Sequence, residues 1–207
     1  MIERIESDLH RDAVTERKDT HAADLEIKTT CTLKEFFMGC TKKLNFSKTI
    51  TLGDGKTTES RVTQKDIEIK PGMKPGTKFR FAGEGNKFPN QLVGDLTIVI
   101  GQHEHDSIKR SGDNLIYRHK INLCDALTAS EVEFRTLEGE LIKYRPDEII
   151  TPEFQKVFPG KGMPIYKDDP LSPLMMDHER GNFILKFQIE FPNSLPDSKK
   201  ERLVSVL

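Results

Sequence analysis

The chain has 207 residues, 35% of them hydrophobic and 31% charged, and its 32 basic and 33 acidic side chains leave a formal net charge of −1. Because nucleic-acid and membrane-surface binding need a marked excess of basic residues, this balance favours neither. No apolar run reaches the roughly 18 residues of a membrane span, and the three cysteines, Cys31, Cys40 and Cys124, form no CxxC pair. We therefore expect a soluble cytoplasmic protein without a disulfide framework or a zinc site.

Residues 1–23 are almost all polar or charged and lack the apolar core of a signal peptide, which predicts a flexible lead. From there the chain repeats itself. Residues 24–101 and 112–191 contain the same order of features: a strand, a short helical phrase, further strands, a glycine loop and a last strand. A repeat of this length is too long for a solenoid unit, so it predicts two copies of one small domain, at 24–108 and 109–192.

The strands of both repeats show apolar and polar residues in alternation. Leu25 and Ile27 alternate with charged neighbours at the start of the first repeat. The last strand of the second repeat carries a longer apolar stripe, made of Phe183, Leu185, Phe187, Ile189 and Phe191. A period of two residues is typical of half-buried strands with one face in water.

Each repeat also contains one short helix. Thr32 and Glu35 have the spacing of a capping box, and Gly39 can end this helix after two turns. Asn122 and Asp125 occupy the matching places in the second repeat, as a weaker form of the same cap.

Turn signals separate the strands, with hairpin dipeptides at Asp54-Gly55 and Glu138-Gly139 and two Pro-Gly turns within residues 71–77. Sheets with frequent tight turns and one helix favour small β-sandwiches. The fold we expect is therefore all-β, or mostly β, with two tandem β-sandwich domains, each with one short helix. Residues 193–207 follow as a C-terminal helix.

The apolar residues of this last segment, Leu203, Val206 and Leu207, share one helical face. A helix this short is marginal alone in water, so we expect its apolar face to dock on another surface.

Catalytic candidates are poor. His103–Asp106 (HEHD) superficially resembles a metal cluster, but it lies between the repeats without a further ligand at a supporting spacing, and a solvated linker is favoured. The glycine loops at 82–86 and 159–163 lack the ending of a phosphate-binding loop and are interpreted as tight turns. No Ser or Cys stands in a nucleophile-elbow pattern. We expect no enzyme activity, no metal and no cofactor.

The strand TKKLNF, residues 41–46, permits two interpretations. Leu44 and Phe46 share one face with Lys42, while Lys43 and Asn45 take the other. If the first face is only core, which the pattern alone favours, Lys42 must extend to water. If that face is the floor of an exposed groove, Lys42 can contact an acidic residue of a peptide beside apolar pockets.

Longer phrases support the groove, because they resemble the C-terminal region of DnaJ-type J-domain co-chaperones. The resemblance runs in register from Asp24 to Leu207, and the motifs GxKxGTKxxFxxEG and PGxGMP are specific to that family. The matching phrases are LKEFFMGCTKKLNF, DIEIKPGMKPGTKFRFAGEGN, IKRSGDNLIYRHKINLCDALTAS, VFPGKGMPIYKDDP and GNFILKFQIEFP. No HPD tripeptide of a J-domain occurs in this chain. No CxxCxGxG repeat occurs either, so the chain is similar to the zinc-free subclass.

The resemblance implies two β-sandwich domains in line, a peptide-binding groove on the first and a C-terminal segment that forms a homodimer. It also implies that the groove holds the acidic C-terminal tail of the seventy-kilodalton heat-shock chaperone, by strand addition and contacts to Lys42 and Lys43. By position, the groove is lined by Ile27, Thr29, Leu44, Phe46 and Ile98, with Lys42 at its edge. Leu203, Val206 and Leu207 would meet a partner copy at a two-fold interface.

Three features depart from the family pattern. Thr29 is polar where the family usually has an aliphatic residue, Met73 replaces a frequent tryptophan, and the insert Leu171–Glu179 is longer than usual. The two repeats have also diverged, because TKKLNF corresponds to the acidic stretch SEVEFRT in the second. We expect the first copy to grip peptide and the second to act as a spacer.

The sequence therefore predicts a co-chaperone fragment that binds unfolded client segments and the acidic tail of its chaperone partner as a dimer. The alternative is a structural J-protein of the ciliary or flagellar radial spoke, located in the axoneme, with which the phrases VEFRTLEGEL and PEFQKVFPGKGMP are compatible.

Overall fold

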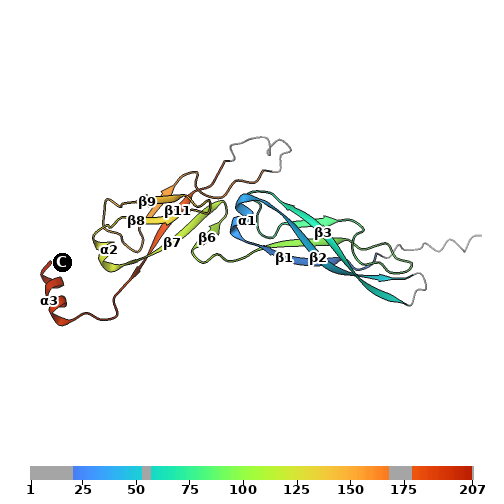
Figure 1. Cartoon of the computed structure of the whole chain (residues 1–207), viewed down its shortest axis with the longest axis horizontal. Coiled ribbons are helices and arrows are strands. Elements are labelled where there is room, and N and C mark those ends of the chain that lie inside the picture. Colours follow the sequence, from blue (N-terminus) through green and yellow to red (C-terminus); the bar gives the residue numbers. More distant parts are fainter. Residues whose placement is uncertain (1–20, 53–56, 168–178, 207) are drawn as a thin grey trace, which may run out of the picture. The chain divides into compact units, whose positions relative to one another are not determined.

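A computed structural model describes residues 21–52, 57–167 and 179–206 (Figure 1). The predicted Asp54-Gly55 turn, most of the 171–179 insert, the first twenty residues and Leu207 lie outside these residues. The elements of the first repeat are β1 (Leu25–Cys31), α1 (Leu33–Met38), β2 (Cys40–Thr51), β3 (Thr58–Ile69), β4 (Lys78–Phe81) and β5 (Leu96–Gln102). Those that follow are β6 (Ile108–Ser111), β7 (Asn114–Asn122), α2 (Leu123–Leu127), β8 (Val132–Arg135), β9 (Leu141–Tyr144), β10 (Gln155–Phe158), β11 (Phe183–Glu190) and α3 (Asp197–Val206).

The expected mostly β fold is confirmed, with several small sheets and short helices. The first repeat has a three-stranded sheet in the order β1-β5-β4 and a two-stranded sheet, β2-β3. The second has a four-stranded sheet in the order β10-β11-β7-β6 and a two-stranded sheet, β8-β9. Each repeat therefore combines a larger sheet, a two-stranded sheet and one helix.

By its internal contacts the chain divides into two compact units. The first contains the described parts of residues 1–29, 43–65 and 78–99, and the second contains residues 30–42 and 66–77 together with the chain from Ile100 onward. The second unit thus includes α1 and the Pro-Gly turns after β3. The boundaries at 24–108 and 109–192 stay a prediction from the internal repeat.

The predicted helix caps are present in both repeats. The hydroxyl of Thr32 accepts a hydrogen bond from the N–H of Glu35, and the Glu35 carboxylate accepts one from the N–H of Thr32. Asn122 accepts from the N–H of Asp125 in the same way. Gly39 ends α1 at a φ of 76° and donates its N–H to the carbonyl of Glu35. These local signals place both helices directly after the first strand of a repeat.

Aromatic side chains join the two sheets of the second repeat. Phe134 of β8 stacks on Phe183 of β11, with ring centroids 5.4 Å apart, and on Tyr117 of β7 at the same separation. Phe158 of β10 meets the Phe134 ring edge-on at 5.8 Å. Because these four residues belong to both sheets, the second repeat is a sandwich with an aromatic centre.

The duplication extends to individual backbone hydrogen bonds. In each repeat the first strand starts beside the last strand, and the glycine loop closes on a glycine two residues before that last strand. The bonds are Leu25 N–H to Asp95 O and Gly85 N–H to Gly94 O in the first repeat, and Leu115 N–H to Asn182 O and Gly162 N–H to Gly181 O in the second. All four lie between 2.8 and 2.9 Å.

The glycine loops therefore serve close backbone packing, as their interpretation as turns predicted. A Cβ on Gly85 would lie 2.6 Å from the carbonyl oxygen of Asp95, and one on Gly162 would lie 2.5 Å from the carbonyl carbon of Gly181. Such distances are far below ordinary contact, so only glycine fits at these two positions.

A buried arginine joins the turn after β3 to the β6–β7 hairpin within the second unit. The side chain of Arg110 is only 4% exposed. Its guanidinium donates to the carbonyls of Met73 at 2.7 Å, Gly72 at 2.8 Å and Gly112 at 2.8 Å. Asp113 adds an ion pair at 3.9 Å. Met73 itself is buried, which gives the residue in the family's tryptophan position a place in the core.

Gly181 provides a test of this packing, because a Cβ there would lie 1.9 Å from the carbonyl oxygen of Asp113. We predict that Gly181→Ala lowers the free energy of unfolding by about 3 kcal/mol or more, since backbone must move to accept the methyl group. Urea denaturation measures the loss. The control is Gly160→Ala, where φ is 70° and the space is open, for which we expect about 1 kcal/mol. An equal or smaller loss for Gly181→Ala would contradict the prediction.

Candidate peptide-binding site

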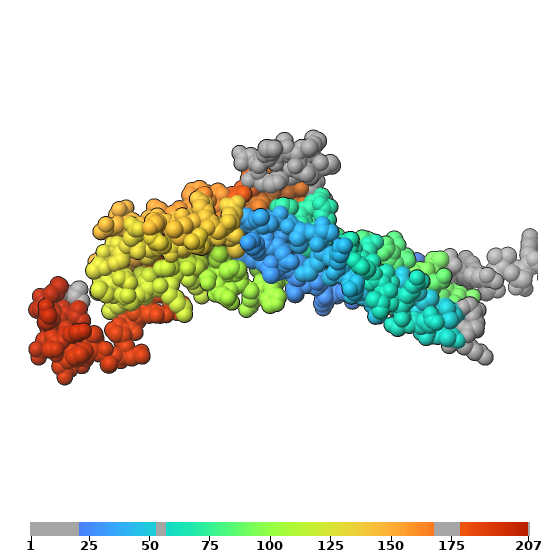
Figure 2. All heavy atoms as spheres, in the orientation of Figure 1, coloured from blue at the N-terminus to red at the C-terminus, as the bar shows by residue number. Residues whose placement is uncertain are grey.

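The two strands that carry the predicted groove residues, β1 and β2, have side chains that are only half-buried. Ile27 and Thr29 of β1 and Leu44 of β2 have intermediate exposure, and they alternate with exposed polar neighbours. β2, in light blue to cyan in Figure 2, reaches the surface on the face shown. Half-buried aliphatic side chains on a strand offer a peptide apolar contact area without further unfolding.

The remaining apolar residues of the predicted groove belong to the core. Phe46 is 8% exposed and Ile98 has no exposed surface. Ile98 lies in β5, where it is paired with Phe79 of β4. In the first unit, Ile27, Thr29 and Leu44 therefore have surface that a peptide can reach, whereas Phe46 and Ile98 are buried.

The two lysines of TKKLNF differ in their surroundings. Lys43 is exposed on the face opposite to Leu44, as the alternation predicts. Lys42, in the second unit, is 27% exposed and has local partners. Its ammonium donates to the carbonyl of Thr30 and lies 3.8 Å from the sulfur of Cys31 and 3.9 Å from the carboxylate of Glu35.

One edge of β2 is open where these residues lie. β2 pairs with β3, and its other backbone hydrogen bonds among the described residues join Thr49 and Thr51 to Lys87. Along Lys43–Phe46 no further strand is paired with β2 in the described chain. An unpaired edge has free N–H and C=O groups that an extended peptide can use.

The helix cap sets the electrostatics beside Lys42. The backbone N–H of Thr32 lowers the pKa of Glu35 below its ordinary value of 4.5, and the Thr32 hydroxyl and Lys42 act in the same direction against a smaller effect of burial. Burial raises the pKa of the Cys31 thiol more than the nearby Lys42 lowers it. The surroundings of Lys42 in the second unit thus include a carboxylate and a neutral thiol, and Cys31 is no activated nucleophile.

The HEHD segment makes hydrogen bonds to the backbone. His103 donates its N–H to the carbonyl of Cys31 at 2.7 Å. The Nδ1 atom of His105 accepts from the N–H groups of Ser107 and Ile108 at 3.3 and 3.2 Å. In the described residues, no group of three or more His, Cys, Asp and Glu side chains is arranged to hold a metal ion.

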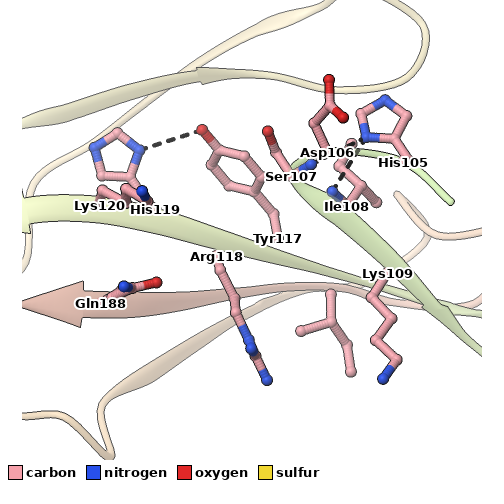
Figure 3. Close-up of a pocket in the computed structure, with 11 residues that line it drawn as sticks. His105, Asp106, Ser107, Ile108, Lys109, Tyr117, Arg118, His119, Lys120 and Gln188 are labelled. Carbon is pink, nitrogen blue, oxygen red and sulfur yellow. Dashed lines mark hydrogen bonds between the residues drawn. The ribbon is translucent and has the colours of Figure 1, made fainter.

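The second unit contains two cavities that the sequence did not predict. One, of about 490 Å³, lies along β6 and β7 and is lined mostly by polar and charged side chains (Figure 3). The other, of about 740 Å³, is lined mostly by apolar residues of α2, α3 and the segment between β11 and α3. The phrase IKRSGDNLIYRHK contains much of the lining of the cavity of about 490 Å³. The sequence does not predict this cavity, because the order of strands in the sheet decides which edge of β7 stays open.

Comparison with known proteins agrees with this architecture. The family described as DnaJ C terminal domain matches residues 25–192. Human DnaJ homolog subfamily B member 13 is 34% identical over 175 residues, which is 84% of this chain and 53% of that protein. Drosophila melanogaster DnaJ protein homolog 1 is 35% identical over 176 residues, 84% of this chain and 50% of that protein. Schizosaccharomyces pombe protein psi1 is 32% identical over 169 residues, 81% of this chain and 42% of that protein.

The fold, with two sheets and one helix per repeat, is thus that of a DnaJ C-terminal domain. The chain belongs to the DnaJ C-terminal domain family. It spans about half the length of these curated relatives. The family is one of chaperones and has no catalytic activity, in agreement with the sequence prediction, and the zinc-free subclass fits the absence of CxxCxGxG repeats from the sequence. No helix in the described residues is long and apolar enough to cross a membrane.

The Glu35 cap predicts a dependence of stability on pH. Because the folded pKa of Glu35 lies below 4.5, its contribution is fully present above the unfolded pKa and is lost as the pH falls through the lower, folded pKa. We predict that Glu35→Gln flattens this acid limb in urea denaturation series. Thr32→Ala, which removes one bond of the box, should cost about 1 kcal/mol at neutral pH. An equal loss of the free energy of unfolding at low pH in the original chain and in Glu35→Gln would contradict this role of Glu35.

Proposed function

We propose that this chain is the substrate-binding part of a DnaJ-type co-chaperone, which binds extended polypeptide segments along β1 and β2. The observation that carries the proposal is that Ile27 and Thr29 of β1 and Leu44 of β2 are half-buried, and that no strand in the described chain pairs with the second edge of β2 along Lys43–Phe46. Backbone hydrogen bonds to the open edge supply affinity for any extended chain, and the apolar side chains favour segments that are buried in folded clients.

We also propose that the acidic C-terminal tail of the seventy-kilodalton heat-shock chaperone binds here. Lys42 is the cation on the apolar face, and Lys43 is exposed on the other face. The Lys42 ammonium lies 3.9 Å from Glu35, a long and partly exposed ion pair that contributes little. A peptide carboxylate at hydrogen-bond distance would form a shorter, charge-assisted contact in its place.

A peptide that ends in Glu-Glu-Val-Asp tests this proposal. We predict that Lys42→Ala weakens its binding by about tenfold, because the loss of one charge-assisted hydrogen bond costs roughly 1.5 kcal/mol. Isothermal titration calorimetry at two salt concentrations measures the affinity, and the wild-type affinity should fall as salt rises.

The matched control is Lys78→Ala, which removes an exposed lysine of β4 and should leave the affinity unchanged. Lys42→Arg keeps the charge and should retain most of the binding. Absence of binding to the wild-type chain, or equal binding to the Lys42→Ala chain, would refute the tail site.

We further propose that the chain forms a homodimer through α3. Leu203 and Val206 face an apolar cavity that also contains Leu123, Leu127 and Phe191. Phe191 is 68% exposed and Val206 is 82% exposed, so considerable apolar surface is left for a second copy to cover. Leu207, the third predicted interface residue, lies outside the described residues. Two grooves in one dimer would bind one long client with increased avidity.

The two exposed valines of α3 give a matched pair, because both are 82% exposed and only Val206 lines the cavity. We predict that Val206→Asp raises the dimer dissociation constant at least tenfold, since it brings a charge into the apolar contact. Val204→Asp should have little effect. Sedimentation equilibrium measures both constants, and equal effects of the two substitutions would argue against this face as the interface.

The cytoplasm is the compartment we propose for this activity. The alternative, a structural role in the axoneme, rests on the resemblance of VEFRTLEGEL and PEFQKVFPGKGMP to J-proteins of the radial spoke. Localisation of a tagged full-length protein separates the two, because a purely diffuse signal excludes the axonemal role.

A further inference from the structure

The strand β7 is longer than the strand that covers it. β6 pairs with Asn114–Tyr117, and the last hydrogen bond along this edge runs from the N–H of Arg118 to the carbonyl of Ser107, at 3.3 Å. β7 continues to Asn122. Its neighbours in the sheet are β11 and β6. In the described chain, His119–Asn122 therefore has no strand on the β6 side, and we name this stretch the open edge of β7.

The backbone of Lys120 faces this open edge. Leu115 donates its N–H to the carbonyl of Asn182, toward β11, whereas Arg118 donates toward β6. Because backbone groups alternate between the two edges of a strand, the odd-numbered residues of β7 bond toward β11 and the even-numbered residues bond toward β6. The N–H and C=O of Lys120 therefore point toward the β6 side of the sheet. No strand of the described chain lies there to form backbone hydrogen bonds with them.

The cavity of about 490 Å³ lies along this edge. Figure 3 shows the rings of Tyr117 and His119 on one side of the β7 ribbon and Arg118 on the other. The His105 ring, held by its two backbone hydrogen bonds, forms part of the wall at the end next to β6. Side chains from both faces of one strand surround the cavity, as expected for a strand edge rather than for a hole in the core.

The two sides of the cavity differ in chemistry. Lys109, Arg118 and Lys120 line the outer side together with Ile116, and Lys186 of β11 lies next to Arg118 in the sheet register. Asp106 is the acidic residue of the lining, and Glu190 forms a long 3.8 Å ion pair with Lys120 in which both side chains are exposed. This excess of cations favours an acidic ligand.

The inner side is aromatic. Tyr117 donates to or accepts from Nδ1 of His119 at 3.3 Å, and their ring centroids are 5.8 Å apart. Burial lowers the pKa of His119, so its imidazole is neutral at pH 7. An apolar side chain can therefore pack on this side without meeting a charge.

We propose that the open edge of β7 is a second peptide site, which takes an extended segment with alternating acidic and apolar residues. The segment would pair with the backbone of Lys120. Successive side chains of a strand point to opposite faces, so every second residue would reach Arg118 and Lys120, and the residues between them would pack on Tyr117 and His119.

This inference goes beyond the groove on β1 and β2, and it replaces the expectation that the second repeat is only a spacer. An isolated anion would satisfy the cations but would leave the backbone of Lys120 unpaired. A run of consecutive acids would place half of its carboxylates against the neutral aromatic side. A segment with alternating acidic and apolar residues can bond to the backbone of Lys120, pair its acids with the cations and pack its apolar side chains on the rings.

The experiment compares two fluorescein-labelled, end-blocked octapeptides. In one, Glu and Val alternate; in the other, four Glu residues precede four Val residues. We expect the full chain to bind the alternating peptide at least tenfold more tightly by fluorescence anisotropy. We also expect the hydrogen exchange of the Lys120 amide, followed by NMR, to slow in its presence, since strand addition bonds this N–H.

The variants use exposed side chains, so the fold should be retained. Arg118→Glu combined with Lys120→Glu should weaken the binding of the alternating peptide at least tenfold. Lys74→Glu combined with Lys78→Glu makes the same charge change at exposed positions elsewhere and should change binding less than twofold. Lys42→Ala should weaken the binding of the alternating peptide much less than the double variant at Arg118 and Lys120 does, which separates this site from the groove of the first repeat.

Equal affinity for the two octapeptides, or unchanged exchange at Lys120, would overturn the proposal. Loss of the alternating peptide with Lys42→Ala but not with the double variant at Arg118 and Lys120 would place its binding in the first groove and would likewise overturn it. The Glu-Glu-Val-Asp titration has its own dependence on Lys42, so either site can fail while the other is supported.

Discussion

The second unit depends on the burial of Arg110. A guanidinium removed from water costs several kcal/mol unless its N–H groups are bonded. Here three backbone carbonyls, those of Gly72, Met73 and Gly112, accept from it, and Asp113 lies nearby. Because Arg110 is part of β6, this network fixes β6 between the turn after β3 and the start of β7. The position of β6 then determines which part of β7 is covered and which part is left open.

The two repeats have an open strand edge in different places. In the first, β2 pairs with β3 on one edge, and among the described residues no strand pairs with its other edge along Lys43–Phe46, where Leu44 is half-buried. In the second, the uncovered stretch is His119–Asn122 of β7, with cations on one side and rings on the other. One duplicated fold thus provides two strand edges of different chemistry.

The sequence predicted those features that depend on neighbouring residues. Alternation gave the strands, Thr32 and Asn122 gave the helix starts, and the glycine loops were recognised as turns, because each of these signals acts within a few residues. It did not predict the burial of Arg110, since the phrase RSGDN has the composition of an exposed turn and two of the three carbonyl partners, Gly72 and Met73, come from a distant segment. The absence of exposed surface on Ile98 and the open edge of β7 also depend on sheet order, which alternation alone does not contain.

The pairing of first and last strands in each repeat has a consequence for synthesis on the ribosome. Asp24 and Asp95, joined by a hydrogen bond, are 71 residues apart, and Asn114 and Asn182 are 68 apart. Neither larger sheet can be completed until the final strand of its repeat has emerged, and such long-range pairing is slow to form. While β11 is being made, the edge of β7 that pairs with it in the native sheet has no partner strand. The chain therefore passes through a stage in which it presents an unpaired strand edge that the native fold covers.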